Sequence, residues 1–441
     1  MPDLGWTLSL ADLLGAPPGE LTANDIRALV GQRVRETDEL DYKATLYGKA
    51  DRDKVELCKD IAGLRNHRGG VIVLGVGEKN AVANGCPEVA LSDAEERRMR
   101  SIVASGTAPH AAFQIRGVEG ETPGRGFYLL IVEASPARPH AVLVEEGLRY
   151  PRRDGTTTRY LSETEVADMY RDRFRGEKQQ IDRLEQITEE TIAQLDKSDE
   201  QRTWLALSLV PNSPGDMTIS FAGRADIEQW ARKEHATRDL IDGFFPELPP
   251  IVGVSVQRYT LTSPADHGKP SRYPYASCFT DGAASVAARL NTGIAGASQP
   301  VVFAPNLVWA TAASLRIAGR HAVRNAGARG DAVVELRLFG PHMLLGYQDS
   351  GFVETYPNAL LVREARARLT LPLQSLAGDP QTVLVATRLA LTEIFNAFGR
   401  AEVAHVTAEG AVRTRYFPSG YGVTEWAGRR GVPTTEEAAP E

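Results

Sequence analysis

Residues 66–76 read NHRGGVIVLGV: a polar turn, two glycines and then a nearly continuous apolar run. Before the turn, residues 53–64 place apolar side chains at a helical period after a capping aspartate. Glycine adopts the left-handed backbone that ends many helices, so Gly69 and Gly70 predict a helix stop. A buried strand over 71–76 then follows, and this order of elements predicts an α/β domain.

Further elements extend this domain in both directions. The segment 39–44 alternates polar and apolar residues, which is typical of a strand. Ser162, with Glu165 three residues later, predicts the start of a helix that runs through Tyr170. Residues 1–20 form a lead-in. The predicted domain spans 21–175, and its other strands are expected at 113–118, 127–133, 141–144 and 148–150.

The rest of the chain predicts a charged helix and a second domain. Residues 176–198 carry an apolar stripe on a charged helix, which indicates either a solvated connector or a short dimer seam. Residues 199–430 combine short apolar runs with two helical segments, 306–326 and 381–398, which predicts a second α+β domain that senses a ligand, dimerises or binds substrate. Residues 431–441 are acidic, and we expect a disordered tail. Strands of the second domain are expected at 204–210, 217–221, 252–260, 273–279, 284–290 and 333–338.

Composition limits the class of protein. The chain of 441 residues is 42% hydrophobic and 24% charged, close to globular averages, which excludes a mostly disordered chain. No run of about 18 or more apolar residues occurs, and the start lacks a basic region before an apolar one. We therefore expect neither a membrane helix nor a signal peptide. Cys58, Cys86 and Cys278 are far apart and fit reduced thiols in a cytoplasmic protein.

The charge balance excludes a globally basic nucleic-acid-binding protein. Lys and Arg number 50 against 57 Asp and Glu, a net charge of −7. Any nucleic-acid contact must therefore come from a local patch. None of the eight histidines lies in an HxxxH or HExxH spacing, and no GxSxG motif occurs. Zinc hydrolases and serine hydrolases are accordingly not expected.

Five short pieces of sequence carry a resemblance to a known family. They are ETDELDYK at 36–43, KDIAGLRN at 59–66, GGVIVLGV at 69–76, RPH at 138–140 and YPRRDGT at 150–156. In this order and spacing they resemble the Schlafen-type AlbA-like domain, which is widespread in bacteria and archaea and forms part of the animal Schlafen proteins. The resemblance covers about a third of the chain. It implies nucleic-acid binding and, in some members, metal-dependent cleavage of structured RNA such as tRNA.

An acidic set could carry that chemistry. Asp41 and Lys43 project from one face of the predicted strand, and metal-dependent nucleases use such an acid–x–Lys pair. The resemblance implies three acids, Glu36, Asp41 and Glu78, that hold Mg²⁺ or Mn²⁺, with Lys43 as helper. Two positions depart from the family pattern: Asp stands at 41 in place of the more usual Glu, and Gly77 stands where an acid is often found. The alternative is a surface strand whose charges face water.

The Asn66–Gly70 turn is a candidate phosphate site. Backbone amides of Gly69 and Gly70 can approach phosphate oxygens, Arg68 adds a charged donor, and Asn66 adds an amide. No Gly-Lys-Ser/Thr follows, so the turn is not a P-loop. The alternative is a helix end that leads into a buried strand.

A second candidate surface for nucleic acid is a basic run in residues 149–159. This run contains four arginines and one acid, Asp154, which gives it a local charge of +3. Tyrosines and threonines lie between the arginines. Arginine binds phosphate and tyrosine stacks on bases. The alternatives are an exposed hairpin and, for the neighbouring His140, a structural histidine. The candidate contacts are Arg149, Arg152, Arg153, Arg159, Thr156 and His140.

The sequence thus predicts a nucleic-acid-binding protein with RNA or DNA as its partner, and a divalent-metal-dependent endoribonuclease as its sharper form. The open alternative is a non-catalytic DNA-binding transcriptional regulator, in which the second domain senses a ligand or forms a homodimer. Residues 199–430 show no catalytic constellation. Their polar residues His342, Tyr347, Asp349 and Glu354 follow no recognisable pattern.

Overall fold

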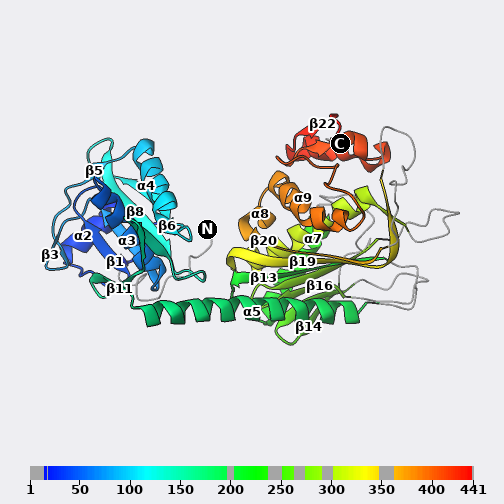
Figure 1. The fold of residues 1–441 in the computed structure, drawn as a ribbon, viewed down its shortest axis with the longest axis horizontal. Coiled ribbons are helices and arrows are strands. Elements are labelled where there is room, and N and C mark those ends of the chain that lie inside the picture. Colours follow the sequence, from blue (N-terminus) through cyan, green and yellow to red (C-terminus); the bar gives the residue numbers. More distant parts are fainter. Residues whose placement is uncertain are drawn as a thin grey trace. The chain divides into compact units, whose positions relative to one another are not determined.

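The computed structural model divides the chain into two compact units, Met1–Lys178 and Gln179–Glu441, which we describe separately. Both units mix helices with sheets, which confirms the predicted fold class (Figure 1). Among the described residues, no helix combines the length and the apolar character needed to cross a bilayer. The structure describes residues 14–16, 18–195, 203–236, 251–262, 274–290, 301–346 and 362–439.

The first unit is built on a five-stranded sheet in the order β1-β2-β8-β5, with β7 also paired to β8. Strands β1 and β2 are parallel and are connected by helix α3 (Asp51–Arg65), while the other pairings in this sheet are antiparallel. The predicted strand, helix and buried strand over residues 39–76 are therefore confirmed. The strands are β1 (Leu40–Lys43), β2 (Gly69–Leu74), β5 (Val89–Ala90), β7 (Gln114–Glu119) and β8 (Arg125–Glu133).

Strand β2 is buried on both faces, which explains its continuous apolar sequence. Val71 and Val73 belong to one hydrophobic cluster together with residues of α2 (Ala23–Gly31). Ile72 and Leu74 belong to the other cluster, which includes residues of α3 and α4 (Asp93–Gly106). The sheet thus forms the middle of three layers, and β1 contributes Leu40 and Tyr42 to the cluster on the α2 side.

The two glycines at the start of β2 permit close contact between strands. A Cβ atom on Gly70 would lie 2.3 Å from the carbonyl oxygen of Glu39, and one on Gly69 would lie 2.5 Å from that of Val132. Both glycines also have positive φ, +82° at Gly69 and +148° at Gly70. No other residue fits this backbone path, so the glycines are required for the fold itself.

The first unit also contains smaller strands that form separate sheets of two or three strands. The hairpin of β11 (Pro151–Asp154) and β12 (Thr157–Tyr160) packs on α3, where a Cβ atom on Gly63 would lie 3.1 Å from Thr158 Cγ2. The other small strands are β3 (Glu78–Lys79) paired with β4 (Val82–Ala83), and β10 (Gly147–Arg149) paired with β9 (Ala141–Val144), which also pairs with β6 (Thr107–Ala108).

Helix α5 (Glu163–Ala193) is one continuous helix of 31 residues, where the sequence indicated two. Its start at Ser162 is as predicted, because Ser162 and Glu165 hydrogen-bond each other's backbone. The expected stripe on its second half is buried: Leu184 and Ile187 pack with Val210 and Phe279 of the second unit. That stripe therefore belongs to the core of the second unit and does not face solvent.

The second unit contains an eight-stranded sheet in the order β14-β15-β16-β17-β13-β19-β18, with β20 also paired to β19. All pairings in it are antiparallel except β18 with β19. The strands are β13 (Trp204–Ser213), β14 (Ile251–Ser255), β15 (Arg258–Thr262), β16 (Pro274–Phe279), β17 (Ala284–Arg289), β18 (Val301–Phe303), β19 (Arg329–Leu345) and β20 (Val362–Pro372).

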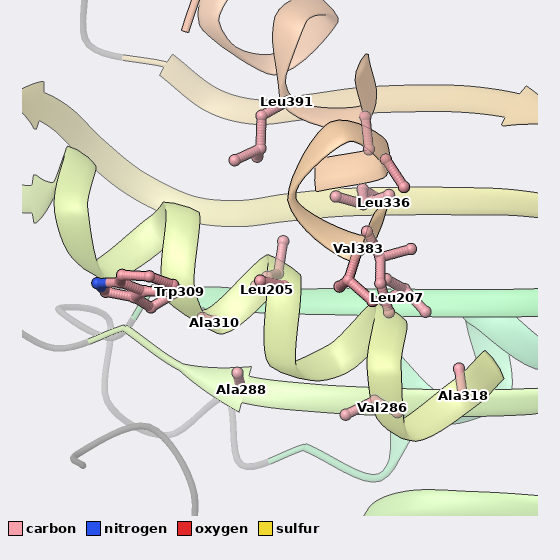
Figure 2. Packing of buried hydrophobic residues seen from close by; sticks show 14 of the residues in the cluster. Leu205, Leu207, Val286, Ala288, Trp309, Ala310, Ala318, Leu336, Val383 and Leu391 are labelled. Atoms are coloured by element: carbon pink, nitrogen blue, oxygen red, sulfur yellow. The ribbon is translucent and has the colours of Figure 1, made fainter. Parts of the chain in front are cut away.

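One face of this sheet is covered by helices that form the main core. Leu205 and Leu207 of β13 and Leu336 of β19 gather with side chains of α7 and α9, such as Trp309 and Leu391 (Figure 2). Strand β13 also supplies Trp204 and Val210 to the clusters on the α5 side, as period-two alternation requires. The helices are α6 (Phe221–Ala236), α7 (Ala304–Arg320), which continues as a π-helix (His321–Asn325), α8 (Leu373–Ala377) and α9 (Pro380–Asn396).

The acidic end of the chain is structured as far as it is described. Strand β22 (Thr434–Thr435) pairs with β21 (Val412–Arg413), and Val432 is buried beside α10 (Val423–Arg430). The expected disordered tail thus does not begin at residue 431, because Val432 and two backbone pairings attach this segment to the second unit.

Candidate nucleic-acid interface and acidic pocket

A cavity of about 400 Å³ lies in the first unit, at the edge where β1, α3 and the β11–β12 hairpin meet. All three predicted acids line it, together with Lys43 and Thr156, so the structure brings these separate pieces of sequence together. We call it the acidic pocket because its lining has five carboxylates and three cations. The lining residues are Glu36, Asp41, Tyr42, Lys43, Ala44, Glu56, Lys59, Asp60, Glu78, Arg153, Thr156 and Thr158.

Strand β1 positions two of these residues by simple alternation. Leu40 and Tyr42 belong to the cluster on the α2 side, which leaves Asp41 and Lys43 on the opposite face. The predicted shared face is confirmed, because Lys43 Nζ lies 2.7 Å from Asp41 Oδ2. A lysine on this face can thus neutralise the acid two residues before it.

Asp41 has a second cationic partner that the sequence did not indicate. The Arg153 guanidinium donates to Asp41 Oδ1 at 2.8 Å, and the two side chains are only 6% and 5% exposed. Removing one partner of a buried ion pair costs about 3–5 kcal/mol, because the other charge is left uncompensated. Arg153 is therefore an internal counter-charge of the acidic pocket. The prediction that Arg153 lies on an exposed basic surface is therefore wrong.

Two other carboxyl groups are held by neutral donors. Glu36 accepts a hydrogen bond from the Tyr42 backbone amide at 3.0 Å, and burial raises the pKa of Glu36. Asp60 accepts one from the Tyr47 hydroxyl at 2.8 Å, and burial raises the pKa of Asp60 to about 6. Asp60 was not among the predicted residues, although it lies in the 59–66 motif.

The charge state of Lys43 follows from these neighbours. Burial disfavours the ammonium ion, but the carboxylates of Asp60 and Asp41 outweigh that effect and raise the pKa of Lys43. The Lys43 ammonium lies 3.6 Å from Asp60 Oδ2. Lys43 is therefore protonated at neutral pH and acts as a positive charge in the pocket, not as a base.

In this conformation, the acids that the resemblance implies as metal ligands have other partners within the protein. Asp41 is shared between Arg153 and Lys43, Glu36 accepts a backbone amide, and exposed Glu78 accepts the Ala81 amide at 2.7 Å. In the described part of the chain, no group of three or more His, Cys, Asp or Glu residues is placed to hold a metal ion. The carboxylates that could bind a metal are thus paired with cations and backbone amides of the protein in this conformation.

Two predicted nucleic-acid contacts are buried and hold the fold together. The Asn66 amide donates to the carbonyl oxygens of His140 and Pro151, at 2.8 and 2.7 Å, and its oxygen accepts the His140 amide. The His140 ring lies 2.7 Å from the Ser135 hydroxyl, and burial lowers the pKa of His140 to about 4. Asn66 and His140 thus join three chain segments and present no polar group to a ligand, contrary to the prediction.

The glycine turn is likewise a structural feature. Gly69 and Gly70 are buried in β2, where they pair with Glu133 and Val132 of β8, so the turn does not offer their backbone to phosphate as predicted. Arg68 is exposed and is the one predicted contact of this turn that lies at the surface.

The predicted basic run is split by the hairpin geometry. Arg153 points inward, whereas Arg152 is opposite Arg159 on the outer face and is half-buried. Arg159 is ion-paired with Glu165 and with Asp154. The expected local charge of +3 is therefore mostly neutralised. Arg149, exposed at the end of β10, and half-buried Arg152 are the arginines of this run that remain without an ion pair to a described residue, and we call these two the arginine surface.

In the second unit, the predicted polar set is not tested. The side chain of His342 and the residues Tyr347, Asp349 and Glu354 lie outside the described residues.

Comparison with known families agrees with this geometry. Residues 36–162 match the family described as Schlafen, AlbA_2. The amino-terminal domain is therefore a Schlafen AlbA_2 domain, which confirms the resemblance seen in the sequence. The match covers less than a third of the chain and gives no family for the second unit. No curated protein matches the chain.

Two solved structures are similar to part of this chain at low identity. One is the DIP2311 protein from Corynebacterium diphtheriae, at 15% identity and a TM-score of 0.23, covering 33% of this chain and 27% of that chain. The other is the N-terminal domain of a RecG-related protein from Nitrosomonas europaea, also at 15% identity and a TM-score of 0.23, covering 32% of this chain and 95% of that chain.

Proposed function

We propose that the first unit binds nucleic acid through phosphate contacts on the arginine surface of Arg149 and Arg152. The observation that carries the proposal is that exposed Arg149 and half-buried Arg152 lie three residues apart on the β10–β11 segment of a Schlafen AlbA_2 domain, and neither forms an ion pair with a described residue. Guanidinium groups bind phosphate oxygens in bidentate geometry. Such binding does not need a basic chain, only a local patch.

Salt dependence tests this proposal. Fluorescence anisotropy with labelled RNA and DNA should show binding that weakens steeply between about 50 and 200 mM salt. The Arg149→Ala/Arg152→Ala variant should bind weakly and with a flatter salt dependence. Arg100→Ala, an exposed arginine on α4, is the matched control and should bind normally. Unchanged binding by the double variant would place the interface elsewhere.

A second candidate is cleavage of structured RNA, favoured by one observation: Glu36, Asp41 and Glu78 line one cavity with Lys43. The Arg153–Asp41 ion pair weighs against it in this conformation. The test incubates purified protein with Mn²⁺ and total tRNA and compares Asp41→Asn. Cleavage that the variant loses would establish the nuclease, and cleavage that persists would exclude these acids. No cleavage of RNA or DNA would favour a binding module, including a DNA-binding regulator.

A further inference from the structure

A row of aromatic rings begins at Tyr150, which lies between Arg149 and Arg152 in the sequence. The ring of Tyr150 meets that of Tyr170 edge-on, with centroids 6.4 Å apart and planes at 79°. The Tyr170 ring then stacks on Phe174, with centroids 6.1 Å apart and planes at 24°. Phe174 is 58% exposed, which is unusual for phenylalanine. We call Tyr150, Tyr170 and Phe174 the aromatic ladder.

Exposed apolar side chains extend this surface along the β9–β10 hairpin. Leu143 and Leu148 face each other across the two strands and are 52% and 51% exposed. Leu148 precedes Tyr150 by two residues, so strand alternation brings it to the same side as the tyrosine. Exposed apolar groups gathered in this way mark a binding surface.

The charges next to the ladder indicate what binds there. Arg152 follows Tyr150 by two residues, so strand alternation brings it to the same side as the tyrosine, and Arg149 directly precedes Tyr150 in the chain. Cations that follow a phosphate backbone, together with rings on which bases stack, are the two parts of a single-strand binding site. A duplex keeps its bases stacked on one another and cannot use the ring faces.

Helix stability alone does not explain the ladder. Tyr170 and Phe174 are four residues apart on α5, and such a pair supports the helix through side-chain contact. A leucine at 174 would keep that contact and the helix, but it has no flat face for a base. The aromatic ring of Phe174 is therefore the part that a bound base would use.

We infer that the aromatic ladder is a stacking platform for unpaired bases, and that the first unit takes single-stranded nucleic acid or an unpaired loop, with its phosphates on Arg149 and Arg152. The inference rests on the proposed function and specifies the form of nucleic acid. Sequence preference is weak at such a site, because every base has a stacking face.

The test measures binding of the full chain to a labelled single strand and to a duplex of the same length. Phe174→Leu should weaken single-strand binding about tenfold, and leave duplex binding unchanged. Leu389→Ala, an exposed leucine of the second unit, is the matched control and should change neither. Circular dichroism checks that Phe174→Leu keeps its helix content.

Each other result contradicts the inference in a distinguishable way. If Phe174→Leu binds single strands normally while Arg149→Ala/Arg152→Ala does not, the ladder is refuted and the proposed function stands. Equal loss on single strand and duplex also refutes stacking. A change of oligomeric state in Phe174→Leu, seen by sedimentation, would show the ladder to be a protein contact. If the unaltered protein binds no nucleic acid, the proposed function and the inference fall together.

Discussion

Each unit of this protein surrounds one buried carboxylate with several cations, but the two arrangements differ in what lies next to them. In the second unit, Glu335 of β19 is fully buried and accepts hydrogen bonds from Arg337, Arg366 and Arg368 at 2.9, 2.6 and 2.7 Å. Arginines of this group are also paired with glutamates of α5, such as Glu185. The arginines of this network are thus paired with glutamates.

In the first unit, Asp41 has two cations, Arg153 and Lys43, but it also borders the acidic pocket. Further acids, among them Asp60, share that cavity, so its lining keeps an excess of negative charge. The comparison indicates that a buried ion network is by itself a structural device. A candidate site needs, in addition, a cavity and carboxyl groups that the network does not fully neutralise.

The largest effect should come from the second unit. Glu335→Gln removes the one charge that three arginines share, and we expect the free energy of unfolding to fall by about 3–5 kcal/mol. Tryptophan fluorescence during urea unfolding measures this, because four of the five tryptophans lie in this unit. Glu364→Gln, which is exposed, is the control. A loss no larger than that of the control would show that the network contributes little.

In the first unit, Arg153→Ala should lower the free energy of unfolding by about 3 kcal/mol, because Asp41 is left buried with Lys43 as its one remaining cation. Arg152→Ala is the natural control, as the neighbouring residue on the opposite hairpin face. The double variant Asp41→Ala/Arg153→Ala should recover part of the loss. Hydrogen exchange of β1 and β2 peptides gives the stabilities, and strictly additive losses would argue against a direct pair.

The pH dependence of stability separates Asp60 from its neighbours. Its pKa is raised to about 6 by burial, so the folded state binds a proton more tightly than the unfolded state, and stability from this group falls as pH rises from about 4 to 6. Asp60→Asn keeps the acceptor for Tyr47 and removes the titration. Relative to the unaltered protein, the variant should gain about 1–3 kcal/mol by pH 7. A difference that stays constant between pH 4 and 7 would contradict this.

The smallest effect on stability should come from the arginine surface. Arg149→Ala and Arg152→Ala should each change the free energy of unfolding by less than about 0.5 kcal/mol, as expected for surface substitutions. Each should instead reduce the slope of log affinity against log salt by about one. Anisotropy titrations at several salt concentrations measure the slope, and an unchanged slope would remove that arginine from the interface.

The patterns that the sequence revealed correctly are local ones. The glycine pair and the apolar run predicted β2, the alternation of residues 39–44 placed Asp41 and Lys43 on one face, and the helical periods predicted α7 and α9. Errors arose where a turn interrupts a run. Residues 252–260 were expected as one strand but form the hairpin of β14 and β15, with Gln257 at positive φ in its turn.

The amino-acid sequence by itself determined the strand–helix–strand element in residues 39–76 and the Schlafen-type character of the first domain, because periodicity and the conformational freedom of glycine act over a few residues. Only the tertiary structure decided which polar residues face a ligand. Hairpin pairing turned Arg153 inward and Arg152 outward, and packing buried Asn66, brought Asp60 into the pocket and set Tyr150 against Tyr170. These outcomes depend on contacts between residues far apart in the chain, and no local pattern encodes them.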